Sequence, residues 1–222
     1  MIVGEPTSNR LVAAHKTSVY LELVCAGKAA HGSRPEAGIN AINRTAELIG
    51  FLQRVIIPEL AAHQSPGFAG STLSAGMIQG GVKPNIVPDR CSLILDLRLV
   101  PNAPPVAELI ADLARRAGAA LGFPVEPGWT QITAGLGTPL DAPLVQTVQR
   151  ALRQQGRDDA PGTVAYCTDA GVFAAKGIPC VVLGPGDILQ AHGAVEYIDI
   201  EELRAATGIY QQTAREWASR RA

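Results

Sequence analysis

Between residues 16 and 132, apolar and polar positions alternate in four stretches, which predicts four β-strands. In each stretch the apolar side chains occupy every second position, so one face of the strand would be buried and the other exposed. The alternation is clearest where Leu93, Leu95 and Leu97 are separated by Ile94 and Asp96. The predicted strands comprise residues 18–26, 71–79, 91–99 and 123–132.

Two stretches between these strands have the spacing of an amphipathic helix. In the first, which we expect to end at Pro58, the apolar stripe consists of Ile39, Ile42, Ala46, Ile49 and Leu52. The second begins after Pro104-Pro105, and its stripe consists of Val106, Leu109, Ile110, Leu113 and Ala117. The order β-α-β-β-α-β predicts a ferredoxin-like α+β layer, with an antiparallel sheet and both helices on one face. The free face and edge of such a sheet would suit pairing with a second copy of the chain.

After residue 133 strands and helices alternate, which indicates an α/β layer. We expect short strands at 163–167 and 179–183, the second wholly apolar and therefore covered on both faces. Helices are expected after Pro143 (Leu144, Val148, Ala151 and Leu152 inward), at 169–176 and at 199–217 (Ile200, Leu203, Ile209 and Tyr210 inward). The expected organisation is therefore an α/β portion at 1–15, an inserted α+β domain at 16–132, and the rest of the α/β portion at 133–222.

Composition excludes several classes of protein. The 222 residues are 47% hydrophobic and 18% charged, so the chain can bury a core. A net charge of −1 without a run of one sign argues against nucleic-acid binding, and no apolar run is long enough to span a membrane. The N-terminus does not show a charged segment followed by an apolar one, so we expect no secretory signal, and no Cys-x-x-Cys pair occurs. The cysteines therefore indicate buried thiols of a cytoplasmic protein: Cys25, Cys91, Cys167 and Cys180.

Two loops of the α/β portion carry candidate chemistry. Gly-Glu-Pro-Thr at 4–7 follows the tail of a strand, and taken alone it is a turn with a solvated Glu5. The loop at 184–192 contains Gly-Pro-Gly, Ala191 and His192, and it follows the apolar strand. Glycine-rich loops at the carboxyl ends of strands are where α/β sheets place ligands.

The inserted domain carries three further candidates, each with a simpler structural interpretation. His31 lies in a glycine- and proline-rich turn between a strand and a helix, and Asn85 lies in the turn-forming segment 80–88. Arg98 lies on the polar face of its strand beside Asp96, where a surface ion pair would suffice. In the α/β portion Thr168 is well placed as a helix N-cap.

Taken in order, these segments resemble the acetylornithine deacetylase / succinyl-diaminopimelate desuccinylase family of zinc amidohydrolases, which includes aminoacylases and glutamate carboxypeptidases. The Thr-Asp-Ala-Gly segment at 168–171 and the 184–192 loop are more similar to the acetylornithine deacetylases. The resemblance implies two zinc ions per active site, with cobalt as a possible substitute, and makes Glu5 and His192 metal ligands. It also implies a homodimer formed through the inserted domain, which acts as a lid over the catalytic α/β portion.

The same resemblance implies roles for the other candidates. His31 would reach into the partner's active site and donate a hydrogen bond to the substrate carbonyl oxygen as negative charge develops on it. Asn85 and Thr168 would contact the substrate, a small N-acyl amino acid, and Arg98 would bind its carboxylate.

Several elements of the family's catalytic machinery have no counterpart in this sequence. The family carries a His-x-Asp motif, a bridging aspartate and a Glu-Glu pair before the Gly-Glu-Pro-Thr turn, and no His-x-Asp occurs here. Glu201-Glu202 lies in the last predicted helix, where a structural role explains it. We therefore expect the chain to begin partway into a longer protein, with an incomplete α/β zinc-hydrolase domain, and to be inactive alone.

Two alternatives remain open. One is a non-catalytic dimerisation or interaction module from a truncated gene. The other is a carboxypeptidase of the same family, which would cleave dipeptides or glutamyl amides better than N-acetylornithine.

Overall fold

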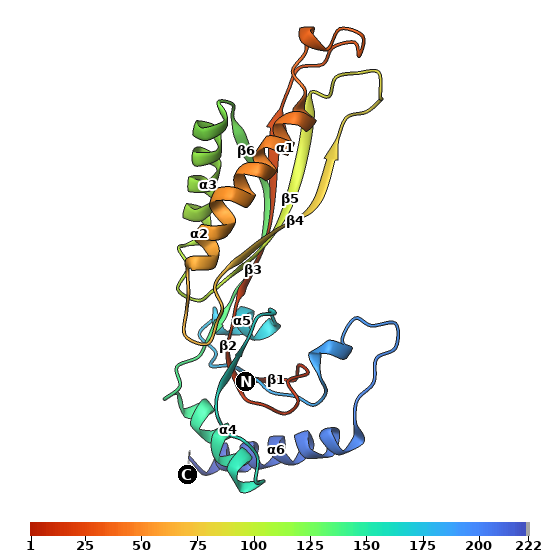
Figure 1. The fold of residues 1–222 in the computed structure, drawn as a ribbon. Coiled ribbons are helices and arrows are strands. Elements are labelled where there is room, and N and C mark those ends of the chain that lie inside the picture. Colours follow the sequence, from red (N-terminus) through yellow and green to blue (C-terminus); the bar gives the residue numbers. More distant parts are fainter. Residues whose placement is uncertain (221–222) are drawn as a thin grey trace. The chain divides into compact units, whose positions relative to one another are not determined.

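The computed structural model describes residues 1–220, and the chain divides into two compact units (Figure 1). Unit 1 comprises Met1–Thr17 and Thr133–Ala222, and unit 2 comprises Ser18–Ile132. Unit 2 is thus an insertion between two segments of unit 1. Both units combine helices with a sheet, so the chain has an α+β architecture.

Unit 2 is built on a four-stranded sheet in the order β4-β5-β3-β6. Its strands are β3 (Thr17–Ala26), β4 (Thr72–Gly80), β5 (Arg90–Leu99) and β6 (Val125–Thr133). Strands β4 and β5 pair antiparallel, with a register shift between Ala75 and Met77. Helices α1 (Ala41–Phe51), α2 (Ile57–Ala62) and α3 (Val106–Leu121) lie along the same side of the sheet (Figure 1).

The predicted alternation of β3 and β5 is confirmed. The inward positions of both strands are at most 2% exposed and pack against α1 and α3 in one core cluster: Val19, Leu21, Leu23, Cys25, Leu93, Leu95, Leu97 and Leu99. Tyr20 and Arg98 lie on the opposite face, which no helix of unit 2 covers. The stripe predicted for α3 also faces this core, with Leu113 and Ala117 buried.

The first helix differs from the prediction in two respects. Ile39 and Ile42 are 42% and 38% exposed, whereas Ile49 and Leu52 of the predicted stripe do pack into the core. The buried positions of the helix also include Ala41, Thr45 and Leu48. The helix also does not end at Pro58, because a π-helical turn at Leu52–Ile56 leads into α2, which continues to Ala62. Proline at the second position of α2 is tolerated because the widened turn precedes it.

Unit 1 contains a sheet of short strands in the order β1-β9-β2-β7, with β8 also pairing with β2. Its strands are β1 (Ile2–Val3), β2 (Val12–His15), β7 (Leu136–Gly137), β8 (Gly162–Val164) and β9 (Val181–Val182). The prediction for β9 is confirmed, because Cys180 through Leu183 are fully buried. Strands β2 and β7 were not predicted.

The helices of unit 1 are α4 (Pro143–Gln154), α5 (Asp169–Ala174) and α6 (Ile200–Ser219). The inward residues predicted for α4 are all buried. For α6 the prediction is correct for Ile209, which is buried, and wrong for Ile200 and Leu203, which are 64% and 49% exposed. The second half of α6 packs, through Ile209, Tyr210 and Trp217, against a buried cluster of unit 1 that includes Leu11, Val145 and Leu183.

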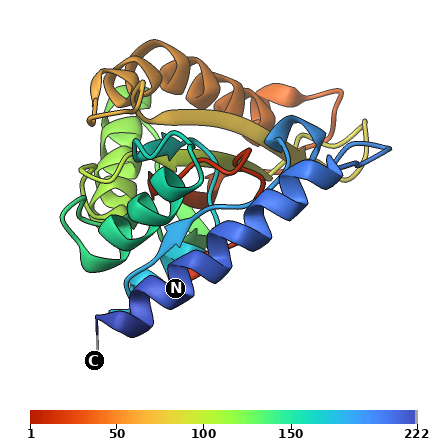
Figure 2. The ribbon, with the colours of Figure 1, turned by 90° about the horizontal axis from the view of Figure 1, so that it is seen from below.

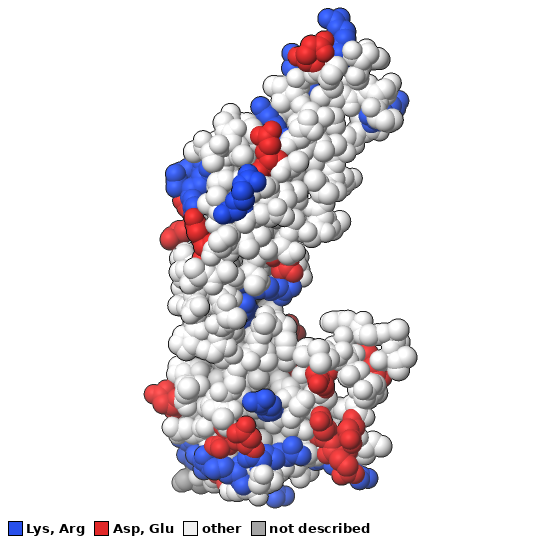
Figure 3. All heavy atoms as spheres, in the orientation of Figure 1, with Lys and Arg blue, Asp and Glu red and all other residues white. Residues whose placement is uncertain are grey.

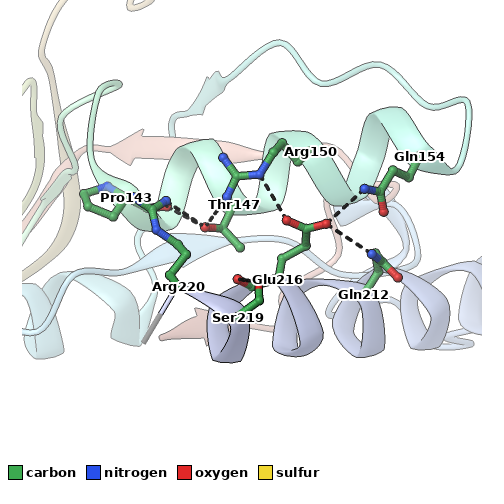
Figure 4. A network of polar contacts seen from close by, with 8 residues as sticks. All are labelled: Pro143, Thr147, Arg150, Gln154, Gln212, Glu216, Ser219 and Arg220. Atoms are coloured by element: carbon green, nitrogen blue, oxygen red, sulfur yellow. Dashed lines mark hydrogen bonds and ion pairs between the residues drawn. The ribbon is translucent and has the colours of Figure 1, made fainter. Parts of the chain in front are cut away.

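A polar network holds α4 and α6 together where they run side by side (Figures 2 and 4). The Glu216 carboxylate accepts hydrogen bonds from Arg150 Nε at 3.1 Å, Gln154 Nε2 at 2.9 Å and Gln212 Nε2 at 3.3 Å. At the other end, Arg220 donates to the Pro143 carbonyl oxygen at 3.2 Å. Gln154 and Arg150 lower the pKa of Glu216 because they bind its ionised form.

This network predicts a pH-dependent stability for unit 1. Because the pKa of Glu216 is lower in the folded state, the ionised carboxylate stabilises the folded chain fully at pH values above the ordinary glutamate pKa of about 4.3. This stabilisation is lost as the pH falls through the lower, folded-state value. In urea unfolding, Glu216→Gln is expected to destabilise the chain at pH 7 and to approach the wild type at pH 3. Glu201→Gln, an exposed position in the same helix, is the control; an unchanged gap between Glu216→Gln and wild type at the two pH values contradicts the prediction.

The cysteines are all free thiols in the structure. Cys25, Cys91 and Cys180 are buried, as predicted, and Cys167 is only partly buried. Burial raises the pKa of the Cys25 and Cys180 thiols, which disfavours the reactive thiolate. Within residues 1–220, no helix is both long and apolar enough to cross a bilayer.

Candidate functional site

The two candidate loops of unit 1 lie together at the carboxyl ends of adjacent parallel strands. Strand β1 pairs with β9, and the loops at 4–7 and 184–187 continue from them. Thr7 N–H donates to the Gly184 carbonyl at 3.1 Å, and Gly184 N–H donates to Thr7 Oγ1 at 3.1 Å. Ser8 N–H reaches the Gly186 carbonyl at 2.7 Å. The loop that carries Glu5 is therefore fixed to the loop that leads to His192.

Gly184 makes this close approach possible. A Cβ atom at this position would lie 2.5 Å from the Glu5 carbonyl oxygen and 2.8 Å from the Gly4 carbonyl carbon, both of which are backbone atoms. After the loop at 4–7 the chain turns sharply, because Ser8 and Asn9 both have left-handed backbone angles, with φ of 53° and 58°. Backbone strain of this kind is often found at functional sites.

Glu5 shares its surroundings with two other polar side chains. The pKa of Tyr166 is raised, first by burial and then by the negative charges of Glu5 and Asp187. Tyr166 O–H donates to the Pro6 carbonyl oxygen at 3.4 Å. This end of the sheet therefore gathers two carboxylates and a phenol.

His192 lies in an exposed loop after a short 3₁₀ turn (Ile188–Gln190). Its backbone is left-handed, with φ of 63°, and its N–H donates to Glu196 Oε1 at 2.6 Å. In residues 1–220 there is no cluster of three or more His, Cys, Asp or Glu side chains that could hold a metal ion. Because a catalytic zinc needs three protein ligands, Glu5 and His192 do not form a complete zinc site.

In unit 2 the structure brings His31 and Asn85 together. Gly32 N–H donates to the Asn85 carbonyl oxygen at 2.7 Å, and His31 forms an isolated β-bridge with Ile86. Both side chains are exposed, and their loops project from the same end of the unit (Figure 1). A cavity of about 550 Å³ lies between the two loops, with Gly32, Ile42 and Lys83 in its lining.

The surroundings of His31 determine which ring nitrogen carries the proton. Ser33 N–H donates to Nδ1 at 3.2 Å, and Ser33 Oγ lies 2.7 Å from the same atom. Because a backbone N–H can only donate, Nδ1 is the acceptor, and the neutral ring carries its proton on Nε2. His31 thus presents a hydrogen-bond donor to solvent.

Arg98 lies near the other end of β5. Its Nε and Nη2 bind Asp96 at 2.8 and 3.0 Å, and Nη2 lies 3.4 Å from the Tyr20 hydroxyl. The His31 loop adjoins the start of β5, where Gly27 N–H donates to the Asp89 carbonyl oxygen at 2.7 Å. Arg98 is seven steps along the extended strand from Cys91, a distance of about 23 Å. Unit 2 therefore keeps Arg98 apart from His31 and Asn85.

Thr168 is a buried N-cap of α5, as its sequence position predicts. Its Oγ1 accepts the Ala170 N–H at 3.1 Å. The same oxygen lies 3.0 Å from Nε2 of His15, a fully buried histidine in β2. His15 was not among the candidate residues, although a histidine that directly follows the apolar run Leu11–Ala14 was a detectable signal.

The surface charge is mixed. On the face shown in Figure 3, Lys and Arg are interspersed with Asp and Glu and form no extended basic surface. This distribution agrees with the net charge of −1.

Comparisons with known proteins show the family. Residues 13–122 match the peptidase dimerisation domain. The acetylornithine deacetylase of Myxococcus xanthus is 32% identical over 210 residues, covering 91% of this chain and 53% of the relative. That of Photorhabdus laumondii is 32% identical over 222 residues, covering 95% and 54%. The chain thus spans about half the length of the curated relatives it matches.

Solved structures agree on the fold. Aminopeptidase PepT from Bacillus cereus matches with a TM-score of 0.74 and 24% identity, covering 97% of this chain and 56% of that protein. The M20 family metallo-carboxypeptidase Sso-CP2 from Sulfolobus solfataricus matches with a TM-score of 0.67 and 20% identity, covering 97% and 62%. The matched dimerisation domain and the deacetylase relatives carry the assignment: the chain belongs to the M20 family of deacetylases and peptidases and corresponds to its C-terminal part.

Proposed function

We propose that this chain is the C-terminal part of a zinc-dependent amidohydrolase that hydrolyses N-acyl amino acids, with N-acetylornithine as the first substrate to test. The observation that carries the proposal is the identity of about a third to acetylornithine deacetylases over nine tenths of the chain. In arginine biosynthesis such an enzyme would act in the cytoplasm, the compartment that the free cysteines also favour.

Residues 16–132 would form a ferredoxin-like lid through which two chains dimerise, between catalytic portions at 1–15 and 133–222. The strand order β4-β5-β3-β6, with the helices on one face, supports the ferredoxin-like part of this proposal. The match of residues 13–122 to a peptidase dimerisation domain supports self-association.

His31 would act as a hydrogen-bond donor to the substrate carbonyl oxygen in the partner's active site. The proton on Nε2 supports this role, because a ring in this tautomer can donate a hydrogen bond from Nε2 without a change of tautomer. Removing one such donor typically costs about 3 kcal/mol of transition-state stabilisation. Asn85, held beside His31, would contact the same substrate.

Arg98 and Thr168 would bind the rest of the substrate. Arg98 uses Nε and Nη2 for Asp96, which leaves Nη1 to bind the substrate carboxylate. Thr168 would contact the substrate through its hydroxyl. Both assignments come from the family resemblance alone.

Glu5 and His192 would supply two ligands of a dinuclear zinc or cobalt centre, whose metal would activate water and polarise the amide carbonyl. The other ligands and the general base would come from outside these 222 residues. None of the four histidines is followed by an aspartate two positions later, so the sequence contains no His-x-Asp motif.

The purified 222-residue chain is therefore expected to release no ornithine from N-acetyl-L-ornithine, with or without added Zn²⁺ or Co²⁺. Amine release measures turnover, and elemental analysis after dialysis measures bound metal. A full-length acetylornithine deacetylase in the same buffer is the positive control. Stoichiometric zinc together with robust turnover would refute this expectation.

The intact mass of the native protein from its source cells tests the wider proposal. A mass well above 23.2 kDa, with deacetylation of N-acetylornithine by that product, supports the amidohydrolase. Faster cleavage of dipeptides or glutamyl amides would instead indicate a carboxypeptidase of the same family. A native mass of 23.2 kDa, with clean dimerisation and no hydrolysis, would indicate a non-catalytic interaction module.

A further inference from the structure

His15 is a fully buried histidine to which the proposed function gives no role. In β2 it pairs with Leu136 of β7 on one side and Val164 of β8 on the other, so its sheet neighbours are apolar. Its ring contacts polar atoms at both nitrogens. Nδ1 lies 3.0 Å from the Lys16 carbonyl oxygen, and Nε2 lies 3.0 Å from Thr168 Oγ1.

These contacts fix the positions of the His15 ring proton and the Thr168 hydroxyl proton. A carbonyl oxygen can only accept, so Nδ1 carries the ring proton and donates it to Lys16. In the neutral ring Nε2 is then an acceptor, and Thr168 O–H must donate to it. Thr168 Oγ1 also accepts the N–H of Ala170 at 3.1 Å.

The neutral form of His15 is the form that this environment favours. Burial lowers the pKa of His15, and the opposing effects come from the backbone carbonyls of Lys16 and His15 itself. The ionisable residues next to His15 and Thr168 in the sequence are Lys16, whose own pKa is lowered by burial, Cys167, and the exposed Asp169. No ionisable side chain is among the causes of the shift at His15.

We propose that His15 is a positioning residue for Thr168: its Nε2 accepts the hydrogen bond of the Thr168 hydroxyl, so that Thr168 can meet a ligand only as a hydrogen-bond acceptor. The oxygen has one lone pair left after it accepts from Ala170. The ligand group at Thr168 is then an N–H or O–H donor, such as an amide N–H or an ammonium group, and a carboxylate or carbonyl oxygen is disfavoured there. The ligand half of this inference rests on the proposed substrate contact of Thr168.

The test is ¹⁵N NMR of the imidazole rings in the full 222-residue chain, with His15 assigned by the signal lost in His15→Gln. In the wild type we expect a proton on Nδ1 and none on Nε2 at neutral pH. Thr168→Val keeps the side-chain volume but removes the hydroxyl donor that stabilises the neutral ring. The apparent pKa of His15 is then expected to rise by about half to one unit, whereas Thr168→Ser should leave it at the wild-type value.

The outcomes separate a positioning role from simple packing. A proton on Nε2 in the wild type, or equal titration of His15 in Thr168→Val and Thr168→Ser, would overturn the proposal. If Thr168→Val unfolds the chain, the wild-type tautomer and the titration of His15 in Thr168→Ser still test the proposal. A proton on Nε2, together with a changed His15 titration in Thr168→Ser, would contradict a hydrogen bond from Thr168 to His15.

A second arm adds N-acetyl-L-ornithine as the probe and follows the Ala170 amide signal. A response in the wild type and Thr168→Ser that is lost in Thr168→Val supports contact between the probe and the Thr168 hydroxyl, and together with the expected tautomer it makes the contacting group a donor. If the Ala170 signal responds in none of the three proteins while the tautomer is as expected, the inference about the ligand group and the proposed substrate role of Thr168 are overturned. The hydrogen bond from Thr168 to His15 would still stand.

Discussion

Replacing Gly184 with alanine is expected to destabilise unit 1 by about 3 kcal/mol, the upper end of the usual cost of overpacking. The added Cβ would lie 2.5 Å from the Glu5 carbonyl oxygen and 2.8 Å from the Gly4 carbonyl carbon. Because both atoms belong to the backbone, no side-chain rotation relieves the clash. The loop at 4–7 must move, which strains the hydrogen bonds that join Thr7 to Gly184.

The chain offers a direct readout, because Trp217 lies in α6 of unit 1 and the other tryptophan, Trp129, lies in β6 of unit 2. In a Trp129→Phe background, urea unfolding followed by fluorescence reports on unit 1. Gly137→Ala is the matched control, since a Cβ at Gly137 would meet nothing within 4 Å. Equal unfolding midpoints for the two alanine variants would show that the loops are not packed as described.

Leu95→Ala is expected to destabilise unit 2 by about 3–4 kcal/mol, within the range measured for buried leucines. Leu95 is fully buried at the centre of β5, between the neighbouring inward residues Leu93 and Leu97. Truncation removes its apolar contacts and leaves a cavity that the surrounding strands and helices cannot fill without moving.

The measurement is again urea unfolding, now followed by the fluorescence of Trp129 in a Trp217→Phe background. Met77→Ala in β4 of the same sheet is the control, because Met77 is 66% exposed and its truncation should change stability by no more than about 0.5 kcal/mol. A loss below 1 kcal/mol for Leu95→Ala would contradict the core described for unit 2.

The strand-and-helix order of unit 2 could be predicted because each strand has one buried face. Along β5 the buried residues occupy every second position, and the hydrophobicity pattern alone records this. The stripe of α1 could not be assigned in the same way. Large apolar residues such as Ile42 lie beside the buried face of α1 and are exposed, whereas small residues such as Ala41 and Thr45 lie on the buried face itself. Residue size at a packed interface is a tertiary property that periodicity does not contain.

Unit 1 was harder to predict because its strands are short. Strands β2 and β7 are four and two residues long, too short for an alternation to be recognised, and β2 includes the buried polar residue His15. The candidate loops were identifiable from the glycines and the motif around Glu5, but the bonds between Thr7 and Gly184 join positions 177 residues apart. Likewise, the contact of His15 with Thr168 depends on folding and leaves no local pattern.

The way the chain enters and leaves unit 2 has a consequence for protein engineering. It enters on β3, which begins at Thr17, and leaves on β6, which ends at Thr133, and these strands are neighbours in one sheet. Close to these points, Gly135 N–H donates to Thr17 Oγ1 at 3.0 Å. Adjacent ends are what domain transplantation and circular permutation require, because a short linker can then join them. The adjacent ends therefore suit unit 2 to exchange between relatives as one segment, with the two joining points placed near Thr17 and Thr133.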